Sequence, residues 1–266
     1  MSVINKDYLD LQKEILKKQL LWKKEISDAI RFVELAQKND NMPLIQQFDL
    51  QVSIPYYKNW ILELMDLLNE REPSLKDEMD QIKRLLNHET LERWVKEVLA
   101  FNEYYFIKLA ETEKVSEWIP QLLAEHGIRP YLRRIAEVYA EEITTIKPMG
   151  TCPCCGEPVR LARLEGKVGK KVMYCPRCYA SWSEKRTKCS HCGVDHDEKM
   201  IYFHLENDQA KLLYVCDDCK GYVKVMDEKQ AFKKEEPALL DLNTIYLDIL
   251  AQEKGYGVTI EKERVN

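Results

Sequence analysis

Four Cys-X-X-Cys pairs occupy the second half of this sequence and constrain its fold more than any other feature. They are Cys152/Cys155, Cys175/Cys178, Cys189/Cys192 and Cys216/Cys219. All nine cysteines lie in this region, and the residues before Cys152 contain none. Two residues between thiolates let both sulfur atoms face one tetrahedral metal ion. Close pairs in a larger chain without a secretory signal favour metal over disulfides. The pattern therefore predicts two metal ions, each bound by four cysteines.

The order of the pairs predicts how each site is built. Two long gaps suit β-hairpins, with strands expected at 159–164 and 171–174 and again at 201–205 and 212–215. Sequential pairing then gives two ribbon modules, because a hairpin brings neighbouring pairs together at low entropic cost. A cross-braced arrangement, first pair with third and second with fourth, fits the same spacing. Cys154, inside the first turn, is expected to be a free, exposed thiol and not a ligand.

The ligand set leaves the metal open between iron and zinc, since four thiolates suit either ion. Zinc would only fold a small β module, whereas iron in a rubredoxin-like site would sense or transfer an electron. His191, His196 and His204 lie among the cysteines. Eight thiolates complete two sites, so these histidines are not expected to bind metal.

The first 147 residues predict an irregular helical bundle. Apolar residues recur at helical spacing over 8–33, 61–68, 75–85, 91–109 and 132–143. Each segment has one apolar face, so the helices must pack on one another. His88 and His126 have no spaced partner and are assigned to the surface or to helix ends. No nucleophile and base arrangement, glycine-rich phosphate loop or paired-carboxylate motif predicts an enzyme.

The expected fold is α+β: an N-terminal all-α domain, two rubredoxin-like or zinc-ribbon modules and a C-terminal helix. The domain boundaries are placed at 1–147, 148–187, 188–234 and 235–266. Pro237 can begin the last helix, which should fold back on the body. Its apolar stripe consists of Leu239, Leu242, Tyr246, Ile249 and Leu250.

The charge of the chain bears on its partners. The net charge of −5 argues against a general nucleic-acid binder, because phosphate must be neutralised by a positive excess. Basic clusters remain at 160–171 and 185–188, either as solvated strand faces or as docking sites for an acidic partner. No apolar run is long enough for a membrane span, and the start lacks the layout of a signal peptide. These features predict a cytoplasmic protein without a membrane partner.

The cysteine motifs resemble those of the FdhE family of formate dehydrogenase accessory proteins. The resemblance rests on Cys152-Pro-Cys-Cys155-Gly156, Tyr174-Cys175-Pro-Arg-Cys178, Lys188-Cys189-Ser-His-Cys192-Gly193 and Cys216-Asp-Asp-Cys219, together with the tail from Leu247 to Tyr256. It covers about residues 150 to 257. Cys154 adds a thiol to the first turn, and Lys220 stands between Cys219 and the following glycine. The second departure puts the geometry of that turn in question.

The resemblance implies a cytoplasmic, non-catalytic maturation factor, a chaperone that binds the catalytic subunit of a formate dehydrogenase. It also implies paired rubredoxin-like modules, with which iron is associated. Protection of the client, redox adjustment and help with cofactor insertion are all compatible with it. Two other functions fit the residues alone: a zinc ribbon that binds nucleic acid, and a rubredoxin-like electron carrier.

Overall fold

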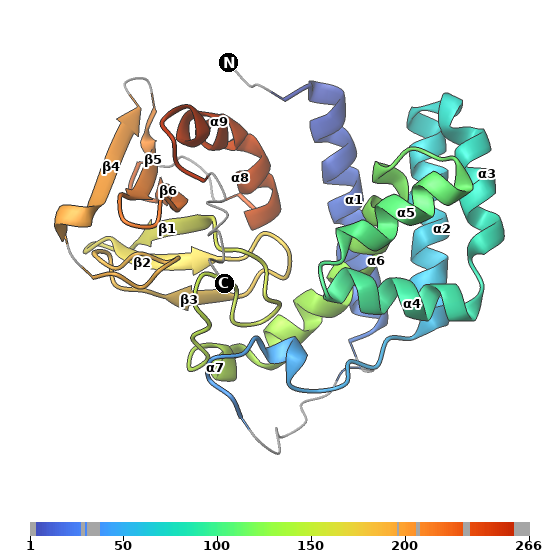
Figure 1. Ribbon diagram of the computed structural model, residues 1–266, viewed down its shortest axis with the longest axis horizontal. Coiled ribbons are helices and arrows are strands. Elements are labelled where there is room, and N and C mark those ends of the chain that lie inside the picture. The colour runs from blue at the N-terminus through green and yellow to red at the C-terminus, as the bar shows by residue number, and fades with distance from the viewer. Residues whose placement is uncertain are drawn as a thin grey trace, which may run out of the picture. The chain divides into compact units, whose positions relative to one another are not determined.

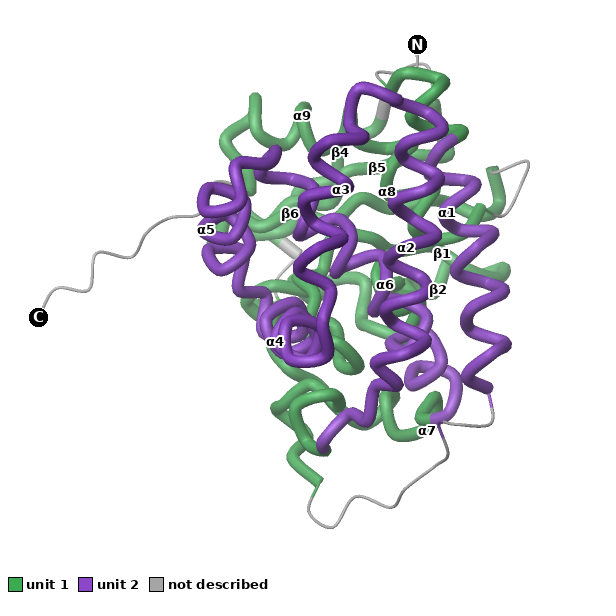
Figure 2. The backbone as a smooth tube through the Cα atoms, turned by 90° about the vertical axis from the view of Figure 1, so that its right-hand side faces the viewer, with its two compact units in different colours: residues 1–10, 34–48, 139–266 green, residues 11–33, 49–138 purple. Residues whose placement is uncertain are grey.

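A computed structural model describes residues 4–27, 30, 38–195, 197–205, 208–230 and 235–257. The chain forms two compact units, coloured separately in Figure 2. The helical unit comprises residues 11–33 and 49–138, and the cysteine-rich unit comprises residues 1–10, 34–48 and 139–266. The predicted α+β class, with helices first and a sheet with two four-cysteine clusters after them, is confirmed. Segment 34–48 belongs to the cysteine-rich unit, which helical periodicity did not indicate.

The helical unit contains a succession of amphipathic helices, which short turns join from the second helix onward. They are α1 (Lys6–Glu25), α2 (Ile54–Arg71), α3 (Lys76–Leu85), α4 (His88–Leu99), α5 (Glu103–Glu113) and α6 (Trp118–Val138), with a 3₁₀ turn at Pro73–Leu75. The core is rich in aromatic side chains. Trp22 stacks on Trp60 with ring centroids 5.5 Å apart, and both rings are buried. Such pairs add to the stabilisation from apolar burial.

Two of the helical segments predicted from apolar spacing have different ends in the structure. The stripe at 91–109 is two helices, because Phe101 takes a left-handed φ of 55° and interrupts the backbone ladder. Asn102 then caps α5, its side chain accepting a hydrogen bond from the Tyr105 N–H. The stripe at 132–143 belongs mostly to α6, which starts much earlier and accommodates Pro130, and ends in the short α7 (Ala140–Ile143). A proline in the interior of a helix normally breaks it, so the sequence did not predict a helix that continues through Pro130.

His126 is buried, so its assignment to the surface or a helix end is wrong. It lies in the middle of α6 with 6% of its surface exposed. The Gln19 amide nitrogen lies 3.1 Å from His126 Nδ1 and donates to the His126 carbonyl at 2.9 Å. Burial, reinforced by the charges of Arg129 and Arg133, holds the pKa of His126 well below its usual value. His88, by contrast, is exposed at the start of α4, beside Glu92.

The buried imidazole predicts an acid-sensitive helical unit. An unfolded histidine takes up a proton below about pH 6.5, whereas folded His126 stays neutral, so the unfolded state binds more protons. Stability should therefore fall as pH drops below about 6.5, by up to about 1.4 kcal/mol per pH unit. Urea unfolding followed by tryptophan fluorescence across this pH range measures the slope. His126→Gln should flatten it and His88→Gln should not; an unchanged slope in the first variant would contradict the assignment.

The cysteine-rich unit is built on one six-stranded sheet (Figure 1). The strands are β1 (Leu161–Glu165), β2 (Lys170–Tyr174), β3 (Ser181–Ser183), β4 (Met200–Leu205), β5 (Asp208–Cys216) and β6 (Tyr222–Asp227), in the order β3-β2-β1-β6-β5-β4. Both predicted hairpins are present, as β1–β2 and β4–β5. The only parallel pair among these strands is β1 with β6, in register from Leu161↔Lys224 to Leu164↔Asp227. That pair makes the two ribbons halves of a single sheet.

The C-terminal segment packs on the sheet, as predicted. It forms α8 (Pro237–Asn243) and α9 (Ile245–Glu253), which lie beside β5 and β6 in Figure 1. Leu247 and Ala251 are fully buried against Leu213 and Val215 of β5. The expected stripe is only partly buried, because the segment is two helices that meet at Thr244 and not one continuous helix. Leu240 and Leu247 are buried, whereas Ile249 is 42% exposed.

Candidate metal centres

The eight predicted cysteines meet in two groups of four, in the sequential arrangement and not the cross-braced one. The first group is Cys152, Cys155, Cys175 and Cys178, and the second is Cys189, Cys192, Cys216 and Cys219. In each group all sulfur atoms lie within 4.8 Å of one another.

The sulfur separations fit a tetrahedral ion. Cys152 Sγ lies 3.6 Å from Cys178 Sγ, and Cys155 Sγ lies 3.6 Å from Cys175 Sγ. In the second group the corresponding separations are 3.7 Å for Cys189–Cys219 and 3.9 Å for Cys192–Cys216. Metal–sulfur bonds of about 2.3 Å in a tetrahedron place the sulfurs about 3.8 Å apart. The donor set therefore suits zinc and iron alike.

All four cysteine turns share one backbone geometry. In each turn, the residue after the second cysteine has a left-handed φ and donates its N–H to the carbonyl of the first cysteine. These residues are Gly156, Tyr179, Gly193 and Lys220, with N···O distances between 2.9 and 3.1 Å. The repetition gives every pair the same orientation of its two side chains.

The departure at Lys220 does not alter the fourth turn. Lys220 itself adopts φ = 58° and makes the same bond to Cys216. A left-handed non-glycine residue costs about 1 to 2 kcal/mol. The glycine is needed one position later, because a Cβ on Gly221 would lie 2.6 Å from the His191 ring. His191 packs there and its Nε2 lies 2.8 Å from the Tyr222 carbonyl oxygen.

Backbone amides point at several of the sulfurs. Ala180 N–H donates to Cys178 Sγ at 3.5 Å, and His191 N–H and Gly221 N–H donate to Cys189 Sγ and Cys219 Sγ at 3.4 Å. Such donors offset the charge of a metal-bound thiolate and orient it. N–H···S hydrogen bonds of this kind are expected around a four-thiolate metal site.

The two groups differ in burial and electrostatics. All four cysteines of the first group are buried, whereas Cys192 and Cys219 of the second are partly exposed. Burial raises the pKa of both Cys155 and Cys189 to about 11. Burial also opposes ionisation of Cys175, but hydrogen bonds from neighbouring thiols lower its pKa overall. A metal must displace the remaining thiol protons, so binding is coupled to proton release.

Cys154 is fully buried, so its expected exposure is wrong. Burial, with hydrogen bonds from neighbouring thiols that include Cys154, raises the pKa of Cys178. Cys154 lies outside the group of four. A segment far away in sequence covers this turn: the 3₁₀ turn Leu44–Gln46 donates backbone N–H groups to the carbonyls of Pro153 at 2.8 Å and Cys154 at 3.0 Å. No sequence signal pointed to this contact.

Two of the five basic residues at 160–171, Arg163 and Lys171, are internal, which corrects their interpretation as docking or solvated side chains. Arg163 is buried, stacks over the Tyr174 ring and donates to Glu228. Lys171 is buried and donates to the Lys188 carbonyl and the Ser190 hydroxyl.

Arg160 is half-buried and shared between two carboxylates. It donates to Glu157 at 2.6 Å and to Asp241 at 2.9 Å. Of this cluster, Lys167 and Lys170 are exposed. In the second cluster, Lys185 pairs with Asp195 at 2.7 Å.

Neither His204 nor His196 belongs to the two groups of four cysteines. His204 is exposed on β4, and His196 lies outside the described residues. In the described part of the chain, no helix combines the length and the apolar character that a bilayer span requires.

Comparisons with known proteins agree with the resemblance seen in the cysteine motifs. A family model, "FdhE, C-terminal domain", matches residues 187–261. The FdhE homolog of Aquifex aeolicus strain VF5 is 30% identical over 108 residues, which cover 40% of this chain and 38% of that protein. Protein FdhE of Escherichia coli O1:K1 is 32% identical over 109 residues, covering 40% and 34%. The alignments thus span little more than a third of these relatives.

A solved structure extends the likeness to the whole fold. The crystal structure of the FdhE protein from Pseudomonas aeruginosa superposes with a TM-score of 0.55 and 16% identity, over 90% of this chain and 83% of that one. At 16% sequence identity, this superposition shows a shared fold and nothing about function. The chain thus carries a cysteine-rich region similar to the C-terminal domain of FdhE proteins, and it shares the fold of the Pseudomonas aeruginosa FdhE protein.

Proposed function

We propose that this chain is a non-enzymatic accessory protein that binds the catalytic subunit of a formate dehydrogenase in the cytoplasm and is needed for its maturation. The observation that carries the proposal is the FdhE C-terminal domain at 187–261. It includes the second four-cysteine group, helix α8 and helix α9, which packs on β5 and β6. The client and the compartment come from the family and extend to this chain by inference.

Each four-cysteine group is proposed to bind one ion, iron or zinc, through all four thiolates. The sulfur separations and the N–H donors to sulfur support this. Zinc would hold the sheet together, and iron would add one-electron chemistry. In either case the protein's own contribution is to orient the thiolates by four equivalent turns.

The internal role of the basic residues weakens the nucleic-acid alternative. Arg160, Arg163 and Lys171 make ion pairs and hydrogen bonds within the cysteine-rich unit. Phosphate binding needs several exposed cations along one surface. The family match therefore favours a protein client over a nucleic acid.

Removal of this protein from its native host should abolish most formate dehydrogenase activity, because the catalytic subunit would not mature. Activity in cytoplasmic and membrane fractions, with and without a plasmid-borne copy, measures the effect. A tagged chain should capture immature catalytic subunit from the cytoplasm in preference to duplex DNA. Normal formate dehydrogenase activity in the deletion strain would overturn the proposal, and tight DNA binding at physiological salt would favour the ribbon alternative.

A further inference from the structure

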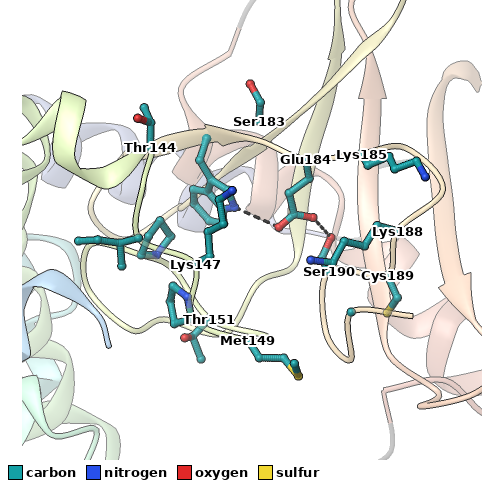
Figure 3. Close-up of a pocket in the computed structure, with 15 residues that line it drawn as sticks. Thr144, Lys147, Met149, Thr151, Ser183, Glu184, Lys185, Lys188, Cys189 and Ser190 are labelled. Atoms are coloured by element: carbon teal, nitrogen blue, oxygen red, sulfur yellow. Dashed lines mark hydrogen bonds between the residues drawn. The ribbon is translucent and has the colours of Figure 1, made fainter. Parts of the chain in front are cut away.

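A cavity of about 280 Å³ lies within the cysteine-rich unit, beside the second four-cysteine group. One wall is the linker that precedes Cys152, and the other is formed by β3 and the residues that follow it, up to Gly193. Figure 3 shows Glu184 in the centre of this pocket, with Lys147 on one side and Lys185 and Lys188 on the other. None of the features assigned to the metal centres needs this cavity.

The pocket has a positive rim. Among the described residues that line it, Glu184 is the one carboxylate, and this group already contacts Lys171 at 3.3 Å, the Ser190 hydroxyl at 2.6 Å and the Trp182 indole at 3.1 Å.

Three lysines remain on the rim, and Lys185 is paired with Asp195. Among the residues that the structure describes, the ammonium groups of Lys147 and Lys188 have no carboxylate partner, and both side chains are exposed. Two uncompensated positive charges thus flank the opening.

The pocket also contains the free edge of the sheet. β3 is the first strand in the sheet order, and among the strands that the structure describes it pairs only with β2. Glu184 N–H donates to the Lys171 carbonyl, and Cys175 N–H donates to the Ala180 carbonyl. Hydrogen-bonded pairs alternate along an antiparallel ladder, so Trp182 bonds to β2 and the backbone groups of Ser181 and Ser183 point outward.

Ser183 lines the pocket. Ser183 faces Val172 in a non-hydrogen-bonded pair, so its N–H does not bond to β2, and no turn or loop carbonyl of the described residues accepts from it. An outward N–H and C=O at an exposed edge can pair with an added strand.

We propose that this pocket binds an extended, acidic segment of a partner protein, which pairs with Ser183 at the edge of β3 and places carboxylates against Lys147 and Lys188. The inference rests on the proposed function, since the partner would be the client, and it assigns the surface that recognises it. The unpaired backbone edge favours a peptide over a free phosphate, because a phosphate would use the lysines but not a strand edge.

The test uses the full metal-loaded chain and a fluorescent peptide of alternating glutamate and valine. Wild-type chain should bind this peptide, more weakly as salt rises, and should bind the matching lysine–valine peptide far less. Lys147→Glu/Lys188→Glu should weaken binding by about tenfold or more. Lys167→Glu/Lys170→Glu, which changes two exposed lysines outside the pocket, should leave it unchanged.

A second pair of variants tests the strand edge. Ser183→Pro removes the outward N–H without breaking the β2–β3 ladder, and should weaken binding by about fivefold. Ser183→Ala keeps the N–H and should bind as wild type does.

Metal content must be unchanged in every variant compared. Failure of the wild-type chain to bind the peptide, equal binding by the lysine variants, or displacement of the peptide by inorganic phosphate at comparable concentration would each overturn the proposal. These measurements need no client, so a deletion strain with normal formate dehydrogenase would refute the proposed function separately.

Discussion

Replacing Cys189 and Cys192 by serine is expected to unfold the whole six-stranded sheet and not only the second ribbon. A structural four-thiolate site contributes about 10 to 16 kcal/mol, which is comparable to the total stability of an ordinary domain, about 5 to 15 kcal/mol. β6 belongs to the second ribbon by its antiparallel pairing with β5, and it is also the parallel neighbour of β1. Loss of β6 therefore removes one side of the first ribbon.

The helical unit should survive that change, because it has a buried core of its own around Trp22 and Trp60. Metal analysis should fall below one ion per chain, and limited proteolysis should leave a core that includes residues 49–138. Circular dichroism should retain most of the helical signal. Retention of one full metal equivalent with an intact first ribbon would show that the two halves fold independently, contrary to this prediction.

Cys154→Ser is the matched control. Cys154 is a buried thiol in the same region, but it lies outside the first group of four. The variant should keep both metal ions, with at most a small loss of stability from placing a hydroxyl in a buried site. Loss of one ion would make Cys154 a ligand and would overturn the assignment of Cys152 or Cys155.

The local parts of this fold could be predicted from the sequence because short-range rules govern them. The two-residue spacing identified the four cysteine pairs, and the apolar segments between them located both hairpins, which favoured the sequential groups of four. Lys220, the residue after Cys219, adopts the same left-handed backbone conformation as Gly156 and Gly193 in the corresponding turns. Here the backbone geometry demanded by the thiolates outweighs the conformational preference of one residue.

The long-range parts could not be predicted in this way. The sequences of β1 and β6 contain no feature that predicts their parallel pairing. The pairing depends on how the two ribbons meet in space. The burial of charged residues in the sheet could not be predicted either, because it also depends on long-range contacts. Arg163 and Lys171 lie in short strands beside turns, where charged side chains are commonly solvated, yet each is buried against acceptors from distant segments. Burial of a charge is decided by its partners, and a single sequence does not reveal them.

Lys224 provides the second large effect. It is 1% exposed in β6, and its ammonium group donates to Asp248 at 2.7 Å and to the Asp241 carbonyl at 2.8 Å. Asp241 also accepts from Arg160, and the two cations together hold the pKa of its carboxyl below the usual value despite burial. This cluster joins α8 and α9 to the sheet through charge as well as through apolar contact.

Lys224→Met is expected to destabilise the cysteine-rich unit by about 3 kcal/mol, because it leaves the half-buried carboxylate of Asp248 without its cation and Asp241 with Arg160 alone. Urea unfolding of the metal-loaded chain measures the loss, and faster proteolysis within 237–253 should accompany it. Lys170→Met, at an exposed position of β2, should change stability by less than about 0.5 kcal/mol. Adding Asp248→Asn to Lys224→Met should recover part of the loss, since it removes one of the unpaired charges. If Lys224→Met is as stable as Lys170→Met, the ion cluster does not hold the C-terminal helices, and the apolar contacts of Leu247 and Ala251 alone account for their packing.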